Sequence, residues 1–327
     1  TAIVAGFCIS AFGGSHVQIG GPTGAFVVIV YGIIVQHGLS GLLTATLMAG
    51  CIMILMGLFH MGALVRHVPY AVTAGFTSGI AVTIFTTQVK DLFGLSIADV
   101  PADFVEKWIA YARHFASLDP WSTGVGLGSV ALIALSPRLT RKVPGSLVAI
   151  VVMTVGIYLL QRYGLATQVE TIGDRFMIKA ELPGMNVPDL DWERVKQLVS
   201  PAITIAVLGA IESLLSATVA DGVIGDHHDS NQELVGQGIA NILSPLFGGI
   251  PATGAIARTM TNINNGGRTP VAGIVHAAVL LLIFLLLMPL ARYIPMACLA
   301  GVLVVVSYSA LETQVDLDGI AFQVAAV

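Results

Sequence analysis

The chain has 327 residues, of which 55% are hydrophobic and 10% are charged, and its mean hydropathy is +0.86. Soluble domains usually carry about 25% charged residues, so this composition excludes an ordinary soluble protein and indicates an integral membrane protein. The formal net charge of −4 argues against a nucleic-acid partner.

Apolar segments recur along the whole chain. Because a spanning helix needs about 20 mostly apolar residues, we expect membrane helices, some short or truncated, at 1–12, 22–36, 39–62, 69–93, 121–137, 144–164, 199–220, 231–247, 252–265, 269–291 and 293–310. The mixed segment 98–118 predicts an amphipathic helix at the membrane surface, and 166–198 is the longest polar loop. No basic leader precedes the first apolar run, so we expect the chain to begin within a helix and to be part of a longer protein.

Basic residues in the loops indicate the orientation. Cytoplasmic loops carry an excess of Lys and Arg, so Arg66 and the basic segment 138–142 predict the cytoplasmic side. The acidic loop 166–198 then lies outside and Arg268 inside. The segment 226–231 also falls inside, and its lack of Lys and Arg counts against this orientation.

Two segments, 12–38 and 247–267, depart from ordinary spans. Both open with Phe-Gly-Gly, contain an early proline (Pro22 and Pro251) and continue into a helix too short to cross a membrane. Paired, interrupted segments of this kind mark the binding site of many transporters. Two half-helix N-termini that face one another present free N–H groups and partial positive charge, which suits an anion. The alternative is that both are kinked spans with packing glycines.

Glu212 is the one charged residue in the apolar segment 197–220. An ionisable group at mid-membrane costs about 2.5–3.5 kcal/mol or more, so it is a functional-site hypothesis by default. At helical spacing it shares a small, polar face with Gly209, Ser213 and Ser216. Burial disfavours its charged form and a nearby cation favours it, a balance that suits proton coupling. The alternative is a structural hydrogen bond or salt bridge between helices.

Arg258 follows a charge-free stretch and stands at the start of the second short helix. Its planar guanidinium suits the oxygens of carboxylate, sulfate or bicarbonate. The alternative, a fixed ion pair with Glu212, is compatible with this role when the site is empty. Small or hydroxylated residues near the two helix starts are further candidates for backbone and hydroxyl donors: Thr23, Gly24, Thr253, Ala255, Ala257 and Thr259.

The histidines and the known catalytic motifs carry less information. His227, His228 and Asp229 favour a solvated loop over a metal site, and we expect His276, in an apolar span, to be hydrogen-bonded between helices. The sequence contains no Walker loop, HExxH or GxSxG motif. One acid and one arginine do not make a catalytic pair, so we expect neither an enzyme nor a bound cofactor or metal.

Four motifs resemble the sulfate-permease (SulP) family of anion transporters, the bacterial branch of solute-carrier family 26. They are GGPTGAF (20–26), VTAGFTSGIAVTIFTTQVKDLFGL (72–95), GAIESLLSA (209–217) and NQELVGQGIANILSPLFGGIPATGAIARTMTNINNGG (231–267). The resemblance covers essentially the whole chain.

This resemblance implies an all-α polytopic membrane protein with two inverted repeats of seven segments, of which 1–327 spans about the second to the twelfth. It implies a core domain that includes 1–93 and 199–267, a gate domain that includes 121–164 and 269–310, and a cytoplasmic STAS domain beyond this chain. The short helices match the third and tenth segments, whose N-termini hold the anion.

Residue by residue, Thr23 and its neighbour Gly24 match the start of the third segment. Ala257 and Arg258 match the anion contact of the tenth segment, with Ala255 and Thr259 beside them. Glu212 matches the eighth-segment acid, and Ser216 lies one turn further on the same face, so this pair is the expected ion-coupling site.

The resemblance also implies the function. We expect a secondary active transporter in a bacterial inner membrane that takes up C4-dicarboxylates such as fumarate with protons, and that forms a homodimer. Sulfate and bicarbonate rank second and third as substrates, sodium is the alternative coupling ion, and an anion channel is the alternative of the same fold. Arg258 argues against a neutral nucleobase as the substrate.

Overall fold

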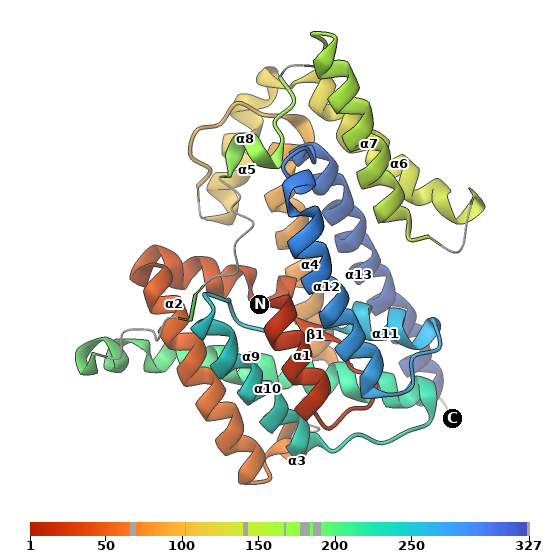
Figure 1. Cartoon of the computed structure of the whole chain (residues 1–327). Coiled ribbons are helices and arrows are strands. Elements are labelled where there is room, and N and C mark those ends of the chain that lie inside the picture. The colour runs from red at the N-terminus through yellow and green to blue at the C-terminus, as the bar shows by residue number, and fades with distance from the viewer. Residues whose placement is uncertain are drawn as a thin grey trace. The chain divides into compact units, whose positions relative to one another are not determined.

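The structure is a computed structural model that describes residues 1–65, 70–101, 103–139, 143–166, 168–176, 184–185 and 191–325 (Figure 1). Of the basic positions behind the predicted orientation, Arg66 and 140–142 lie outside these residues. The chain is an all-helical membrane fold apart from two very short strands, as the sequence predicts. By length and composition, four helices among the described residues are apolar enough to cross a membrane: α2, α7, α9 and α12.

The chain forms two compact units, unit 1 (Thr1–Tyr70 and Glu181–Leu286) and unit 2 (Ala71–Ala180 and Leu287–Val327). Unit 1 contains α1 (Ala2–Phe12), β1 (Gly20–Gly21), η1 (Gly24–Phe26), α2 (Val27–Leu58), α3 (Gly62–Val65), α9 (Trp192–Ile224), α10 (Ser230–Leu246), β2 (Thr253–Gly254), α11 (Ile256–Asn264) and most of α12 (Pro270–Ala291). The division into core and gate domains stays a prediction.

In unit 1, α2, α9 and α10 pack against one another (Figure 1). Their shared core includes Leu42 and Met53 of α2, Leu198 of α9 and Leu234 of α10, all fully buried. Small residues let two of these helices approach closely, because a Cβ on Gly238 of α10 would lie 2.6 Å from a backbone oxygen of α2. Glycine contacts of this kind are typical of helices that pack in membranes.

The helix α2 is interrupted once. Gly38 has non-helical dihedral angles (φ 70°, ψ 179°) inside an otherwise continuous run of 32 residues. Glycine adopts positive φ without the steric cost that a Cβ brings. The break separates the two expected segments 22–36 and 39–62 where the sequence predicts a boundary.

Unit 2 contains α4 (Tyr70–Phe93), α5 (Phe104–His114), η2 (Phe115–Ser117), α6 (Pro120–Leu139), α7 (Gly145–Arg162), α8 (Ile172–Arg175) and α13 (Met296–Ala325). Its core lies between α6, α7 and α13, and includes Val125, Ile157 and Ala297. The helix α5, expected within 98–118, exposes Val105 and Ile109 and meets α6 at a bend of 117°.

The expected polar loop 166–198 is partly helical. The helix α9 begins at Trp192, within this expected loop. Its first turns are polar and exposed, and they extend the helix on the N-terminal side of its apolar part. Just before α8, the backbone of the loop bonds to the start of α13: Met296 N donates to Glu170 O at 2.9 Å. Arg175 of α8 donates to the carboxylate of Asp91 at 2.8 Å. Hydrophobicity alone gave no signal for either contact.

Candidate functional site

The two interrupted segments meet in unit 1 as antiparallel strands. β1 pairs with β2 so that Gly20 lies opposite Gly254 and Gly21 opposite Thr253. β1 leads into η1 and α2, and β2 leads into α11, so two helix starts lie beside a common pair of strands. The predicted arrangement of two short half-helices preceded by extended chain is confirmed, although the first half-helix continues through Gly38 into the rest of α2.

Side chains supply hydrogen bonds that such short strands lack. Ile19 N donates to Thr259 Oγ1 at 3.1 Å, and Gly254 N donates to Ser213 Oγ at 3.2 Å. Thr253 Oγ1 donates to Gly209 O at 3.1 Å. Non-helical backbone at membrane depth is tolerated only where its polar groups are satisfied internally. Ser213 on the polar face of α9 thus accepts from β2, while Thr259 of α11 accepts from the residue before β1.

Glu212 lies on α9, partly buried, and its Oε2 accepts a hydrogen bond from Thr23 Oγ1 at 3.1 Å. This bond brings the acid to the start of the first half-helix. Ser216 is fully buried one turn away and donates to Thr259 Oγ1 at 3.4 Å, not to Glu212. Ser216 therefore connects α9 to α11, while Glu212 connects α9 to η1.

Arg258 links the second half-helix to the first strand. Its Nη1 donates to Gly20 O at 3.1 Å and its Nη2 donates to Pro22 O. These acceptors flank Gly21, which has φ +148°, and a Cβ on Gly21 would collide with Arg258 Nη1. The guanidinium is therefore held over the turn between β1 and η1, at a position where only glycine leaves room for it.

The alternative of a fixed ion pair between Arg258 and Glu212 receives no support. The ion pairs formed by the described residues do not include one between these two groups, although they lie within electrostatic reach of each other. The carbonyl groups of Gly20 and Pro22 use two of the five guanidinium N–H donors, so three donors remain beyond these two bonds.

The other predicted residues take different places. Ala257 is exposed in the first turn of α11, where backbone N–H groups have no partner within the helix. Gly24 is partly buried at the start of η1. The N–H of Ala255 is already used, since it donates to Ile19 O at 3.1 Å, and the hydroxyl group of Thr259 bonds to Ile19 N. Both of these residues contribute to the strand crossing.

Sequence reasoning missed three polar side chains in this unit. Gln18 Nε2 donates to Ser213 O at 3.2 Å. Glu233 and Asn241 of α10 bond to backbone in the two interrupted segments, which we call the crossover segments (12–26 and 247–264). A signal was present in α10, where polar residues recur at four-residue spacing within an apolar helix.

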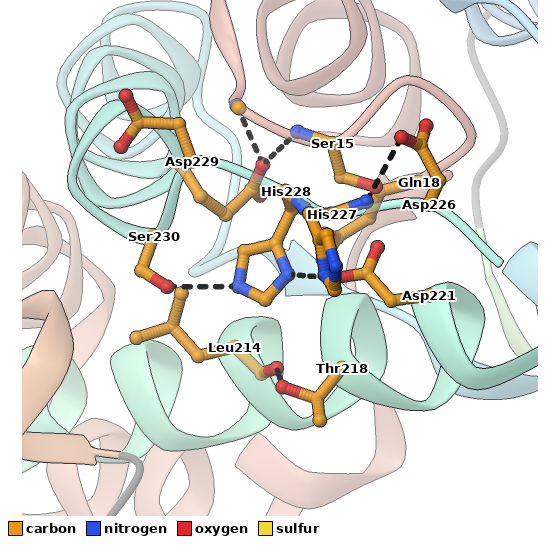
Figure 2. Close-up of polar contacts among 12 residues, drawn as sticks. Ser15, Gln18, Leu214, Thr218, Asp221, Asp226, His227, His228, Asp229 and Ser230 are labelled. Atoms are coloured by element: carbon orange, nitrogen blue, oxygen red, sulfur yellow. Dashed lines mark hydrogen bonds and ion pairs between the residues drawn. The ribbon is translucent and has the colours of Figure 1, made fainter.

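The loop between α9 and α10 contains a buried histidine (Figure 2). His228 Nδ1 lies 2.7 Å from Asp221 Oδ2, and its Nε2 lies 3.0 Å from Ser230 Oγ. The expectation of a solvated loop is therefore wrong for His228, whereas His227 and Asp229 are exposed as expected. Asp226 of the same loop pairs with His16 at 3.1 Å. The hydrogen bond from His16 lowers the pKa of Asp226 from its ordinary value.

Two further expectations about histidines can be compared with the structure. Within the described ranges, no group of three or more His, Cys, Asp or Glu side chains has a geometry that could hold a metal ion. Among the residues that the structure describes, the buried Nδ1 of His276 in α12 has no hydrogen-bond partner, so the expectation of a hydrogen-bonded histidine is wrong for this atom.

The fold and the crossing strands can now be compared with known proteins. The profile of the sulfate permease family matches residues 1–321. The chain belongs to this family. The putative sulfate transporter YvdB of Bacillus subtilis is 45% identical to it over 312 residues, which is 95% of this chain and 58% of that protein. The bicarbonate transporter BicA of Synechocystis is 34% identical over 92% of this chain and 53% of that protein.

Solved structures of sulfate permease relatives agree with the fold. The transmembrane domain of a cyanobacterial bicarbonate transporter BicA aligns with a TM-score of 0.83 and 31% identity, covering 95% of this chain and 79% of that chain. The structure of SLC26A9 aligns with a TM-score of 0.84 at 19% identity, which supports the fold alone. The chain spans about half the length of the curated relatives that it matches.

Proposed function

We propose that this chain forms the transport part of a secondary active anion transporter of the sulfate permease family, which works by alternating access. One observation carries the proposal: the pairing of β1 with β2 places two helix starts, an arginine and an acid in one small region of unit 1. Helix N-termini and a guanidinium together favour an anion.

In this proposal the anion lies near the starts of η1 and α11. The N–H groups of Gly24, Ala257 and Arg258 and the free donors of the Arg258 guanidinium bind it. Thr23 contributes its hydroxyl group once that group is released from Glu212. Ala255 and Thr259 act from the strand crossing behind the anion, because their hydrogen-bonding groups are already paired with Ile19.

Glu212 is the proposed coupling residue. A carboxylate that accepts a hydrogen bond from Thr23 repels an incoming anion, whereas a neutral carboxyl group does not, so uptake of a proton and of an anion support each other. Ser216 holds α9 and α11 together behind this acid. Sodium in place of the proton is the alternative coupling ion, and uncoupled flux would indicate an anion channel of the same fold.

The proposed substrate is a small oxyanion. The sequence motifs favour a C4-dicarboxylate such as fumarate, while the names of relatives that are 45% and 34% identical favour sulfate and bicarbonate. All three have planar or tetrahedral oxyanion groups, in which two oxygen atoms can accept paired N–H bonds from a guanidinium. The proposed location is a bacterial inner membrane, in line with the bacterial origin of these relatives. The proposed assembly is a homodimer.

The experiment is uptake by the full-length protein in proteoliposomes. Labelled fumarate, sulfate and bicarbonate are each offered with an imposed proton gradient and then with a sodium gradient. Gradient-driven uptake of one anion supports a coupled transporter, and the effective gradient identifies the ion. Flux of an anion that neither gradient accelerates would support the channel, and no flux of any of the three would contradict the proposed substrate class.

A further inference from the structure

The helix α10 buries a row of polar side chains. Glu233, Gln237, Asn241 and Ser244 recur every three or four residues on one face, and each is at most 1% exposed. Burying polar groups is costly unless they are hydrogen-bonded. Three of the four bond directly to backbone in the segments that lead into the two strands, so this face of α10 has a purpose beyond packing.

Asn241 makes a reciprocal pair with one residue of the second crossover segment. Its Nδ2 donates to Ala252 O at 2.8 Å, and Ala252 N donates to its Oδ1 at 2.9 Å. A residue in a neighbouring β-strand would satisfy the same two backbone groups. Ala252 directly precedes β2 (Thr253–Gly254), so Asn241 fixes where this strand begins, and with it the start of α11.

Glu233 does the same for the first crossover segment. Its Oε2 accepts hydrogen bonds from Gly14 N at 2.9 Å and Ser15 N at 3.1 Å, and its Oε1 accepts from Gln237 Nε2 at 2.7 Å. Gly14 and Ser15 lie in the turn between α1 and β1. Both backbone N–H groups converge on one oxygen of Glu233, so this turn is held to α10.

We propose that α10 sets the relative register of the two crossover segments, and that Asn241 and Glu233 are positioning residues for the anion site. Neither residue touches the anion. Asn241 acts through β2 on Arg258, and Glu233 acts through β1 on the carbonyl groups of Gly20 and Pro22 that hold that arginine. This inference rests on the proposed anion site.

The alternative is that these contacts only stabilise unit 1. The two possibilities differ in what a small disturbance changes. A shift in register moves Arg258 relative to its acceptors on β1, which weakens anion binding in protein that remains folded. Purely structural contacts would lower the melting temperature and leave the affinity of the folded protein unchanged.

The test compares Asn241→Ser with Asn231→Ser in the full-length protein. Asn231 lies on the same helix, and its Oδ1 also accepts a backbone N–H, but from Gly62 of α3 rather than from a crossover segment. Each variant is titrated with fumarate, sulfate and bicarbonate, with the melting temperature as the readout, and KM and kcat are measured by uptake. We expect Asn241→Ser to raise Kd and KM at least about tenfold, and Asn231→Ser to leave both within about twofold.

A substitution of Glu233 provides an independent arm of the test. Glu233→Met keeps about the size of the side chain but removes both oxygens, including the one that accepts from Gly14 N and Ser15 N. We expect a rise in Kd similar to that of Asn241→Ser. Unchanged Kd in both variants, with a lower melting temperature, would overturn the proposal. Failure of both to give folded protein would also overturn it, because these contacts would then hold the whole unit together.

A labelling experiment separates this inference from the proposed function. Ala257→Cys, in a background without Cys8, Cys51 and Cys298, reports the exposure of the first turn of α11 to a maleimide. We expect Asn241→Ser to change its labelling rate at least about threefold, whichever anion is carried, and an unchanged rate would contradict the proposed register. If the parent protein binds none of the three anions, the proposed substrates fail while this result still stands.

Discussion

The two crossover segments share a backbone plan but not a chemistry. Each opens with Phe-Gly-Gly, forms a two-residue strand and starts a helix. The first segment, 12–26, has no acidic, lysine or arginine side chain and supplies carbonyl oxygens and the hydroxyl group of Thr23. The second, 247–264, supplies Arg258, whose donors bond to those carbonyl oxygens. The two segments therefore share a backbone arrangement but contribute different groups. The second carries the positive charge, and the first carries the carbonyl groups that hold it.

The segments also differ in the helices that they start. The first half-helix continues past a single glycine into the rest of α2, whereas α11 ends after nine residues. The first segment is therefore continuous with a long, well-packed helix, and the second is a separate short helix held by side chains. Substitutions in the second segment are expected to affect binding more than those in the first.

The largest effect is expected for Arg258→Ala. It removes the positive charge that the proposal assigns to the anion site. It also removes the two charge-assisted hydrogen bonds of the proposed bidentate contact with the anion, each of which contributes about 1.5–3 kcal/mol. We expect anion affinity to fall on the order of a hundredfold, measured as the Kd from anion-dependent melting. Arg258→Lys keeps the charge but not the paired geometry and should recover only part of the affinity. Wild-type affinity in Arg258→Ala would remove the arginine from the site.

Glu212→Gln tests whether the acid that contacts the first segment couples transport to protons. The amide keeps the size of the side chain and can accept from Thr23, but it cannot titrate. We expect uptake driven by a proton gradient to fall at least about tenfold, while exchange of one anion for another persists. Proteoliposome uptake at several external pH values measures this, and an unchanged pH dependence would exclude the coupling role.

Gly21→Ala tests the close approach between the segments. Both Gly21 and Gly38 have positive φ, but a Cβ would meet Arg258 only at Gly21 and would meet open space at Gly38. A non-glycine residue in such a sparsely populated conformation costs about 1–3 kcal/mol in either place. We therefore expect both alanine variants to lower the melting temperature, and Gly21→Ala alone to weaken anion binding, by about fivefold. Equal affinities in the two variants would argue against the contact.

The smallest effect is expected for Asp226→Asn, outside both segments. Since the pKa of Asp226 is lowered in the folded chain by its bond to His16, the pair contributes stability above the ordinary aspartate pKa and loses it as the pH falls through the lowered value. Exposed pairs contribute little. We expect no measurable change in transport at neutral pH, and a change comparable to that of Gly21→Ala would show that this loop influences the site.

Local chemistry explains why the sequence predicts the crossover segments well. Glycine and proline interrupt an apolar run by their own backbone properties, so the breaks near Pro22, Gly38 and Pro251 are legible without knowledge of the fold. Glu212 and Arg258 stand out for the same reason, because a lone charge in an apolar segment needs an explanation. The boundaries shift where polar turns extend a helix, as at Trp192 of α9.

The partners of these residues could not be predicted, because they depend on which distant backbone lies nearby. The sequence leaves an ion pair between Arg258 and Glu212 open. In the structure, the arginine bonds instead to the backbone carbonyl groups of Gly20 and Pro22. Asn241 and Glu233 are visible only as polar positions in a helix. The burial of His228 depends on what packs over the loop, which no local pattern contains.

The side-chain acceptors of the crossing strands have a consequence for hydrogen exchange. The amide groups of Ile19, Ala252 and Gly254 are each bonded to a single hydroxyl or carboxamide oxygen: those of Thr259, Asn241 and Ser213. Rotation of one side chain frees each amide, whereas an amide inside α9 or α10 is released only when the helix opens. Deuterium uptake at these three amides therefore times the local opening of the crossing, separately from the unfolding of the helices around it.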